Sequence, residues 1–500
     1  MTSLLYSGGT TVYLRQTGGV TSYSVDQTTW LSATFPITLT NTNTAAGLVI
    51  VLFITDVTLT TSSDYFVCAS SHIQFGSPSL NSGGSRPTIT VDSVLAFSGL
   101  IENSGGNSNI NVYNLHVHAI NGSALNTAGG WIGQRYFGGS DNYVINCSSD
   151  GDIIDGGGGI VGQDASNVHI IGCWSLGQIG GTYAGGIVGL YAGTVTIDGC
   201  WSEGLISGIQ AGGILGAYAS TSTRVSGCYS IGDITGLQAG GIVGSNASGL
   251  VVASYSSGNI VGTNSGGIVG SNSSFVAVVN NSYSVGAIGP TSGGIYGGSG
   301  LSPSAWGCYV CGALLGANGQ IFAGSTTIPA NCAYSAGGWS SSTANATLFN
   351  VGTAWIEIVA NQPYELNNMG YTPYTNAIIT TSTQTLVHSS ASTVLKGSST
   401  NGAIVSGQSY TIVTGGGVGV GINATSGVIS TTSSTPSATY TLLLRNTVSG
   451  TTNGYSLSTY TLTVTTPPTP TPPPPPIIVL PPSLRNGWRQ FTFRVYEGDF

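Results

Sequence analysis

Three aspartates that lie close together in the sequence are the first groups that could perform chemistry. Asp150, Asp152 and Asp155 fall in one short segment, with Asp164 nearby. Clustered carboxylates bind calcium or act as general acids and bases. We favour ordinary solvent-exposed residues. The two alternatives are a calcium-binding corner formed by Asp150, Asp152 and Asp155, and the active site of a polysaccharide-degrading enzyme.

A pair of histidines is the second candidate for metal chemistry. His116 and His118 are two residues apart, so both lie on the same face of a strand. Imidazoles are common zinc ligands. The sequence indicates no third ligand for this pair, so we expect hydrogen-bonded surface residues, no bound metal and no cofactor.

Cysteine and aromatic side chains recur at fixed intervals. Five of the eight cysteines (Cys147, Cys173, Cys200, Cys228 and Cys308) occupy one repeat position, which favours small buried side chains and free thiols. A neighbouring position predicts an aromatic ladder, which either supports the fold by stacking, as we favour, or forms a sugar-binding strip. The ladder consists of Trp174, Trp201, Tyr229, Tyr255 and Tyr283.

A repeated sequence must position all of these residues. A Gly-Gly-Ile triplet recurs with a spacing of 26 to 28 residues, and it is paired with a Cys-aromatic-Ser block. A fixed period of this length indicates stacked structural units. Because short stretches such as 194–197 alternate in strand fashion, the units are predicted to be rungs of an all-β parallel β-helix, each about 27 residues long. The closing isoleucines of the triplets are Ile160, Ile187, Ile214, Ile242, Ile268 and Ile295.

The repeat also places the carboxylates relative to one another. Asp152 aligns with Asp233 three rungs away, and Asp150 aligns with Glu203 two rungs away. At ~4.8 Å per rung these pairs are about 14 Å and about 10 Å apart. Both separations exceed those of glycosidase carboxylates. We therefore expect no catalytic residues and no enzymatic activity.

The composition excludes several classes of partner. Charged residues make up 5% of the chain, nine of them are Lys or Arg, and the net charge is −8. Phosphate neutralisation needs basic clusters, so nucleic-acid binding is not expected. The start of the chain lacks the basic and apolar regions of a secretory signal peptide. The most apolar stretch, 45–57, is too short to span a membrane.

Changes in composition divide the chain into six predicted parts. The β-helix is expected between an N-terminal cap, which also offers an oligomerisation surface, and a C-terminal cap. A small Ig-like β-sandwich, a polyproline linker and an aromatic, basic tail follow. The boundaries are 1–75 for the N-terminal cap, 76–350 for the β-helix, 351–375 for its C-terminal cap, 376–466 for the sandwich, 467–482 for the linker and 483–500 for the tail.

Two groups of motifs resemble known families over about residues 50–370. The repeat, [A/S]-G-G-I-V-G…C-[YW]-S-x-G-x-I, resembles the GLUG-type repeats of large right-handed β-solenoid surface proteins and adhesins. Upstream motifs are similar to those of β-helix repeat proteins encoded by giant nucleocytoplasmic DNA viruses. The region 376–466 resembles bacterial Ig-like modules in pattern. The upstream motifs are DYFVC (64–68), HIQFG (72–76), GGWIG (129–133), YFG (136–138) and NYVINCSSDG (142–151).

The resemblance to viral proteins implies a structural protein of the virion, made in the host cytoplasm, and it supplies no catalytic residues. We expect a rigid β-helix rod in a capsid, tegument or surface-fibre layer. Its expected partners are further copies of itself, as a trimer or a larger lattice, and other virion proteins. The first alternative is a glycan-binding adhesin or fibre at a cell surface, and the second is a polysaccharide-degrading β-helix enzyme.

Overall fold

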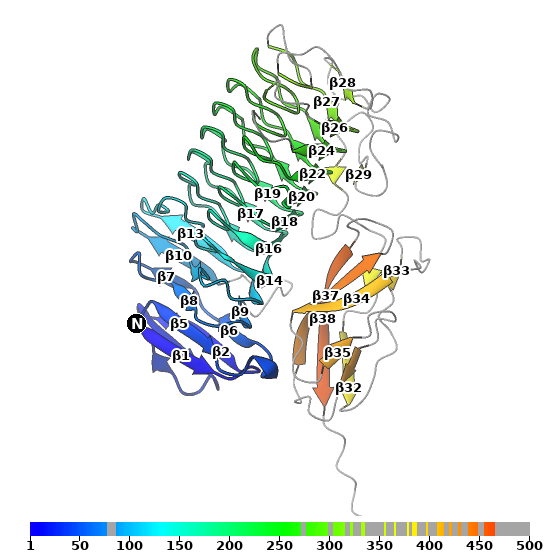
Figure 1. The fold of residues 1–500 in the computed structure, drawn as a ribbon. Coiled ribbons are helices and arrows are strands. Elements are labelled where there is room, and N and C mark those ends of the chain that lie inside the picture. Colours follow the sequence, from blue (N-terminus) through cyan, green and yellow to red (C-terminus); the bar gives the residue numbers. More distant parts are fainter. Residues whose placement is uncertain are drawn as a thin grey trace, which may run out of the picture. The chain divides into compact units, whose positions relative to one another are not determined.

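The computed structural model describes residues 1–77, 87–271, 277–298, 304–315, 321–323 and 332–335, together with separate strands between residues 355 and 465. Short strands that pair in parallel from rung to rung dominate the first 335 residues (Figure 1). The chain is therefore an all-β, parallel β-helix repeat protein, as the sequence predicts. Among the described residues, no helix has the length and apolar character of a membrane span.

The described strands of residues 1–335 form three sheets, and the smallest of them covers residues 2–102. The 4-stranded sheet consists of β1 (Thr2–Tyr6), β5 (Ile37–Asn41), β8 (Phe66–Cys68) and β11 (Ile101–Glu102). The 11-stranded sheet consists of β7 (Val57–Leu59), β10 (Thr88–Asp92), β13 (His116–Ile120), β15 (Ser148–Ser149), β17 (Trp174–Ser175), β19 (Trp201–Ser202), β21 (Tyr229–Ser230), β23 (Tyr255–Ser256), β25 (Tyr283–Ser284), β27 (Tyr309–Val310) and β28 (Ala333–Tyr334).

The 13-stranded sheet carries the longer strands. It consists of β2 (Thr11–Thr17), β3 (Val20–Ser24), β4 (Leu31–Ser32), β6 (Val49–Phe53), β9 (Ile73–Gly76), β12 (Ile110–Tyr113), β14 (Gly138–Ile145), β16 (Ser166–Ile171), β18 (Val195–Asp198), β20 (Arg224–Ser226), β22 (Leu250–Val252), β24 (Val278–Asn280) and β26 (Ser304–Trp306). Its strands pair in parallel, except that β3 pairs antiparallel with both β2 and β4.

The first 75 residues contribute strands to all three sheets. β1 pairs in parallel with β5, and β2 pairs in parallel with β6. The antiparallel strands β3 and β4 lie at the edge of the 13-stranded sheet. A short 3-10 helix, η1 (Thr44–Ala46), precedes β6. Parallel stacking therefore starts within the segment that the sequence sets apart as a cap.

Identical positions on successive rungs form the core. The repeat isoleucines Ile160, Ile187, Ile214, Ile242, Ile268 and Ile295 are all fully buried. In β18, Val195 and Ile197 are buried whereas Thr196 between them is partly exposed, as strand alternation predicts. Burying such an aliphatic side chain contributes about 1.5–3 kcal/mol, so a column of isoleucines is a substantial source of stability.

The Gly-Gly pairs are required because backbones approach closely there. A Cβ atom on Gly185 would overlap the carbonyl oxygen of Val188, and one on Gly186 would overlap the carbonyl oxygen of Gly213 on the next rung. Neither glycine has a positive φ, so close approach and not left-handed backbone explains them. No side chain fits at these positions.

Left-handed backbone occurs instead at the turn before the cysteine column. One residue of each rung adopts positive φ there, and from Asn114 to Asn281 its N–H donates to a carbonyl of the next rung. Glycine and asparagine occupy most of these positions because they tolerate this conformation best. The column is Asn114, Asn146, Gly172, Gly199, Gly227, Ala253, Asn281 and Gly307.

The cysteine column is buried, as predicted. Cys147, Cys173, Cys200, Cys228 and Cys308 are 0% exposed, and the serines that replace cysteine in two rungs are equally buried. The backbone N–H of each of the first four donates to the side chain at the same position of the next rung. For example, the N–H of Cys147 donates to the Sγ of Cys173 at 3.3 Å. All eight cysteines of the chain are free thiols.

The C-terminal predictions fall largely outside the described residues. Within the expected cap, β29 (Trp355–Ile356) pairs antiparallel with β30 (Glu365–Leu366). The Ig-like sandwich stays a prediction, and the polyproline linker and the tail lie outside the described residues. The remaining strands are β31 (Ile378–Ile379), paired with β33 (Gly397–Ser398), β35 (Val420–Ile422), paired with β36 (Ile429–Thr431), and a 4-stranded sheet of β32 (Thr383–Val387), β38 (Tyr455–Thr465), β37 (Thr439–Val448) and β34 (Gln408–Thr414).

Candidate functional site

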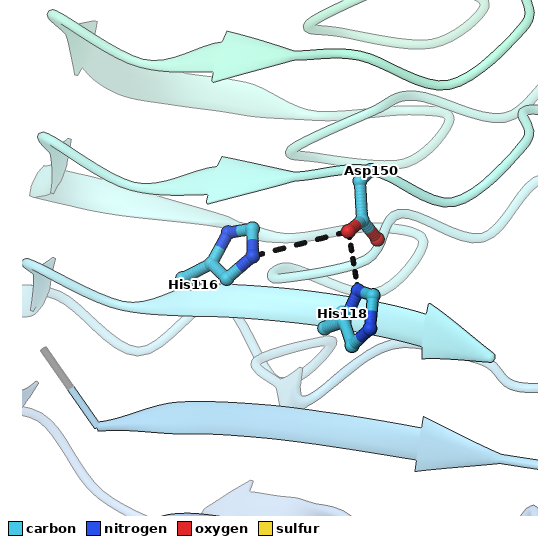
Figure 2. A group of neighbouring side chains, drawn as sticks. All are labelled: His116, His118 and Asp150. Carbon is cyan, nitrogen blue, oxygen red and sulfur yellow. Dashed lines mark hydrogen bonds and ion pairs between the residues drawn. The ribbon is translucent and has the colours of Figure 1, made fainter.

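Two histidines and one aspartate meet on the outer surface of the 11-stranded sheet. His116 and His118 alternate along β13, so they project from the same face (Figure 2). The parallel register pairs His116 with Ser148 of β15, and the same register places Asp150 beside His118. One ligand atom from each of His116, His118 and Asp150 lies within 4.8 Å of the others.

The carboxylate of Asp150 contacts both imidazoles. Its Oδ2 forms a hydrogen bond with His118 Nδ1 and lies 3.9 Å from His116 Nε2. The two imidazole rings are nearly parallel, with centroids 6.2 Å apart and an interplanar angle of 20°. The three side chains are 29%, 43% and 24% exposed for His116, His118 and Asp150, so ions from solvent can reach them.

Neighbouring groups hold the three side chains in place. His116 Nδ1 lies 2.8 Å from the Ser148 hydroxyl. The backbone N–H of Ala119 donates to Asp150 Oδ1 at 2.9 Å. Beneath the next residue, the fully buried Trp131 donates its indole N–H to the Gly151 carbonyl at 2.9 Å. These hydrogen bonds therefore give both imidazole rings and the carboxylate a defined orientation.

Asp150 is a third potential metal ligand beside the histidine pair, which the sequence does not indicate at the regular period. The rung that joins His116 to Ser148 is 32 residues long, whereas the regular repeat has a spacing of 26 to 28 residues. Comparison at the regular period therefore misses Asp150 as the neighbour of His118. The signal that finds it is the pair of similar segments N-L-H-V-H (114–118) and N-C-S-S-D (146–150). The expectation of hydrogen-bonded surface histidines is confirmed.

The other two predicted aspartates have different partners. Asp152 Oδ1 accepts the N–H of Gln178 at 3.0 Å, and Asp155 Oδ1 accepts the N–H of Thr182 at 2.7 Å. Asp233 accepts the N–H of Asn259 in the same way. In the described part of the chain, the group suited to a metal contains Asp150 without Asp152 or Asp155. These two carboxylates satisfy backbone donors of the following rung.

The aromatic ladder forms one continuous stack on the same sheet. Successive rings from Trp174 to Tyr283 have centroids 4.8, 5.9, 5.1 and 4.9 Å apart, with interplanar angles of 4°, 1°, 5° and 7°. Burial, with a smaller contribution from Glu203, raises the pKa of Tyr229 to about 12, so this phenol is uncharged at neutral pH. Sugar binding to aromatic residues normally uses a free ring face, and inside this stack each face meets the neighbouring ring.

Alternating exposed residues beside the stack form what we call the ladder face. In 174–180, 201–209, 229–237 and 255–263, every second residue is buried and the residues between are exposed or partly exposed. Glu203 and Asp233 are the charged residues among them. Six aliphatic side chains of this face are 40–50% exposed: Leu176, Leu205, Ile209, Ile231, Leu237 and Val261.

The fold and the site define a parallel β-helix repeat protein with a histidine–aspartate cluster next to an aromatic ladder. Comparison with known protein families, with curated proteins and with solved structures finds no match to this chain.

Proposed function

We propose that this chain is a non-enzymatic structural protein whose β-helix packs laterally against further copies of itself. The ladder face carries this proposal. Six partly exposed aliphatic side chains and one aromatic stack lie there with two charged residues, both acidic. Apolar side chains exposed on successive rungs favour a site of protein interaction.

The stacked rings favour a structural role for the ladder over a glycan-binding role. Interplanar angles of 1° to 7° leave mainly ring edges toward solvent. Stacked aromatic pairs are worth about 0.5–1.5 kcal/mol beyond the area they bury, so the ladder stabilises the coil itself. A flat stack with neutral edges also suits contact with an equally flat surface.

Another copy of the chain is the occupant that suits this face best. Association through like surfaces is the commonest arrangement in soluble oligomers. Few charges on the chain oppose it, since charged residues are 5% of the sequence. A partner with a strongly charged surface would leave its charges unpaired at this face.

We further propose that the assembly belongs to a virion and forms in the host cytoplasm. The upstream motifs resemble those of giant-virus β-helix proteins, as described above. Eight free thiols are compatible with folding in a reducing compartment. Detection of the protein in purified particles by mass spectrometry tests this part separately from self-association.

The test of lateral packing is sedimentation of the full chain over a concentration series. Wild-type protein is expected to associate as concentration rises. Replacing Leu176 and Leu237 together by lysine (L176K/L237K) places charges in the proposed interface, and this should weaken association about tenfold or more.

The matched control is L95K/L315K, because Leu95 and Leu315 are exposed aliphatic residues outside the ladder face. It adds the same charge and is expected to associate like wild type. Equal weakening by both double variants, or a wild-type chain that stays monomeric at every concentration, contradicts the proposal.

A further inference from the structure

We propose that His116, His118 and Asp150 form a binding site for one divalent transition-metal ion of the zinc type. The site does not depend on the proposed self-association, because all three ligands come from one chain. It would use two imidazole nitrogens and one carboxylate oxygen, and it would leave one coordination position toward solvent.

The separations of the ligand atoms suit a tetrahedral ion. With metal–ligand bonds of about 2.0–2.1 Å, two ligands of a tetrahedron lie about 3.4 Å apart. His116 Nε2 and Asp150 Oδ2 are 3.9 Å apart, and the three ligand atoms fall within 4.8 Å of one another. The His118–Asp150 hydrogen bond must open to admit the ion. Rotations of the side chains suffice, since all three are partly exposed.

The hydrogen bonds around the cluster orient the candidate ligand atoms. Ser148 Oγ accepts a hydrogen bond from His116 Nδ1 when that nitrogen is protonated, which leaves the Nε2 lone pair toward Asp150. The Ala119 N–H fixes Asp150 Oδ1, so Oδ2 remains for the ion. Metal-binding sites commonly orient their histidines and carboxylates through such second hydrogen bonds.

The ligand types select the class of metal. Two imidazoles with one carboxylate suit zinc and neighbouring transition metals, whereas calcium and magnesium prefer oxygen ligands. The net charge of −8 favours the approach of a cation. A simple hydrogen-bonded pair of His118 and Asp150 needs no second histidine, yet His116 directs its Nε2 at the same carboxylate oxygen (Figure 2).

Calorimetric titration of the full chain with zinc chloride, after removal of metals with a chelator, tests the site. The expected result is one zinc ion per chain and a higher thermal unfolding midpoint in the presence of zinc. D150N and H118N should each weaken zinc binding by at least about tenfold and abolish the rise of the midpoint. Circular dichroism of the metal-free variants checks that they fold.

Two matched controls separate this site from other groups. D152N changes a carboxylate two residues away that accepts the Gln178 N–H, and it should bind zinc like wild type. C332S removes a cysteine that is only partly buried, and cobalt bound to wild type should show no thiolate charge-transfer band. Absence of zinc binding by wild type, equal affinity in D150N and wild type, or a cobalt–thiolate band that C332S abolishes would each overturn the proposal.

Discussion

At the scale of single residues, the serine that follows each ladder residue shows how tightly the repeat is packed. Ser175, Ser202, Ser230, Ser256 and Ser284 are fully buried, and in the part of the chain that the structure describes their hydroxyls have no hydrogen-bond partner. A Cβ on Gly186 would lie 2.9 Å from the Cβ of Ser202. The space beside Gly186 therefore admits only a small side chain at position 202. Size, and not hydrogen bonding, explains these serines.

Replacement of one such serine by alanine should therefore not lower the free energy of unfolding. S202A removes a buried hydroxyl without a partner, and the free energy of unfolding is expected to stay unchanged or rise by up to about 1 kcal/mol. S149A is the matched comparison, because the Ser149 hydroxyl donates to the Gly159 carbonyl at 2.6 Å. It should lower the free energy of unfolding by about 1 kcal/mol. Urea unfolding of both variants measures the difference, and equal losses would show that Ser202 has an unseen partner.

The site residues also show the limit of sequence reasoning at this scale. The ladder from Trp174 to Tyr283 follows the regular period, so its stacking could be predicted. The meeting of Asp150 with His116 and His118 could not be found at that period, because the intervening rung is longer. Irregular rungs bring together residues that a fixed spacing keeps apart.

At the scale of structural elements, the turn before the cysteine column places its own demand on the sequence. One residue per rung is left-handed there, and Ala253 occupies this position with φ of 46°. Left-handed backbone costs an L-residue with a Cβ about 1–2 kcal/mol. The sequence pattern marks the Gly-Gly pairs more strongly than this turn, yet the turn is where left-handed backbone is needed.

Glycine at this turn should stabilise the protein. A253G relieves the left-handed conformation but adds freedom to the unfolded chain, so we expect a net gain of about 0.5–1 kcal/mol. A287G is the control: Ala287 is not among the left-handed residues, and its replacement by glycine should destabilise by about 0.5–1 kcal/mol. The two variants should shift the urea midpoint in opposite directions. A loss of stability in A253G would contradict the strain assigned to this turn.

At the scale of the whole molecule, the repeat predicts the parallel β-helix but not the function of the protein. Apolar, glycine and small residues stay constant from rung to rung, and they build the core, the close backbone contacts and the cysteine column. These columns serve the fold. Their regular spacing therefore predicts the fold class but says little about function. The function must come from outward positions, which vary between rungs and whose partners the sequence does not name.

Cryo-electron microscopy of the self-associated full chain shows directly which surface of one copy meets a neighbouring copy. We expect copies to lie side by side, with the ladder face between residues 174 and 263 covered and with Leu176, Ile231 and Leu237 inside the contact. Copies that meet through another surface and leave the ladder face in solvent would contradict it.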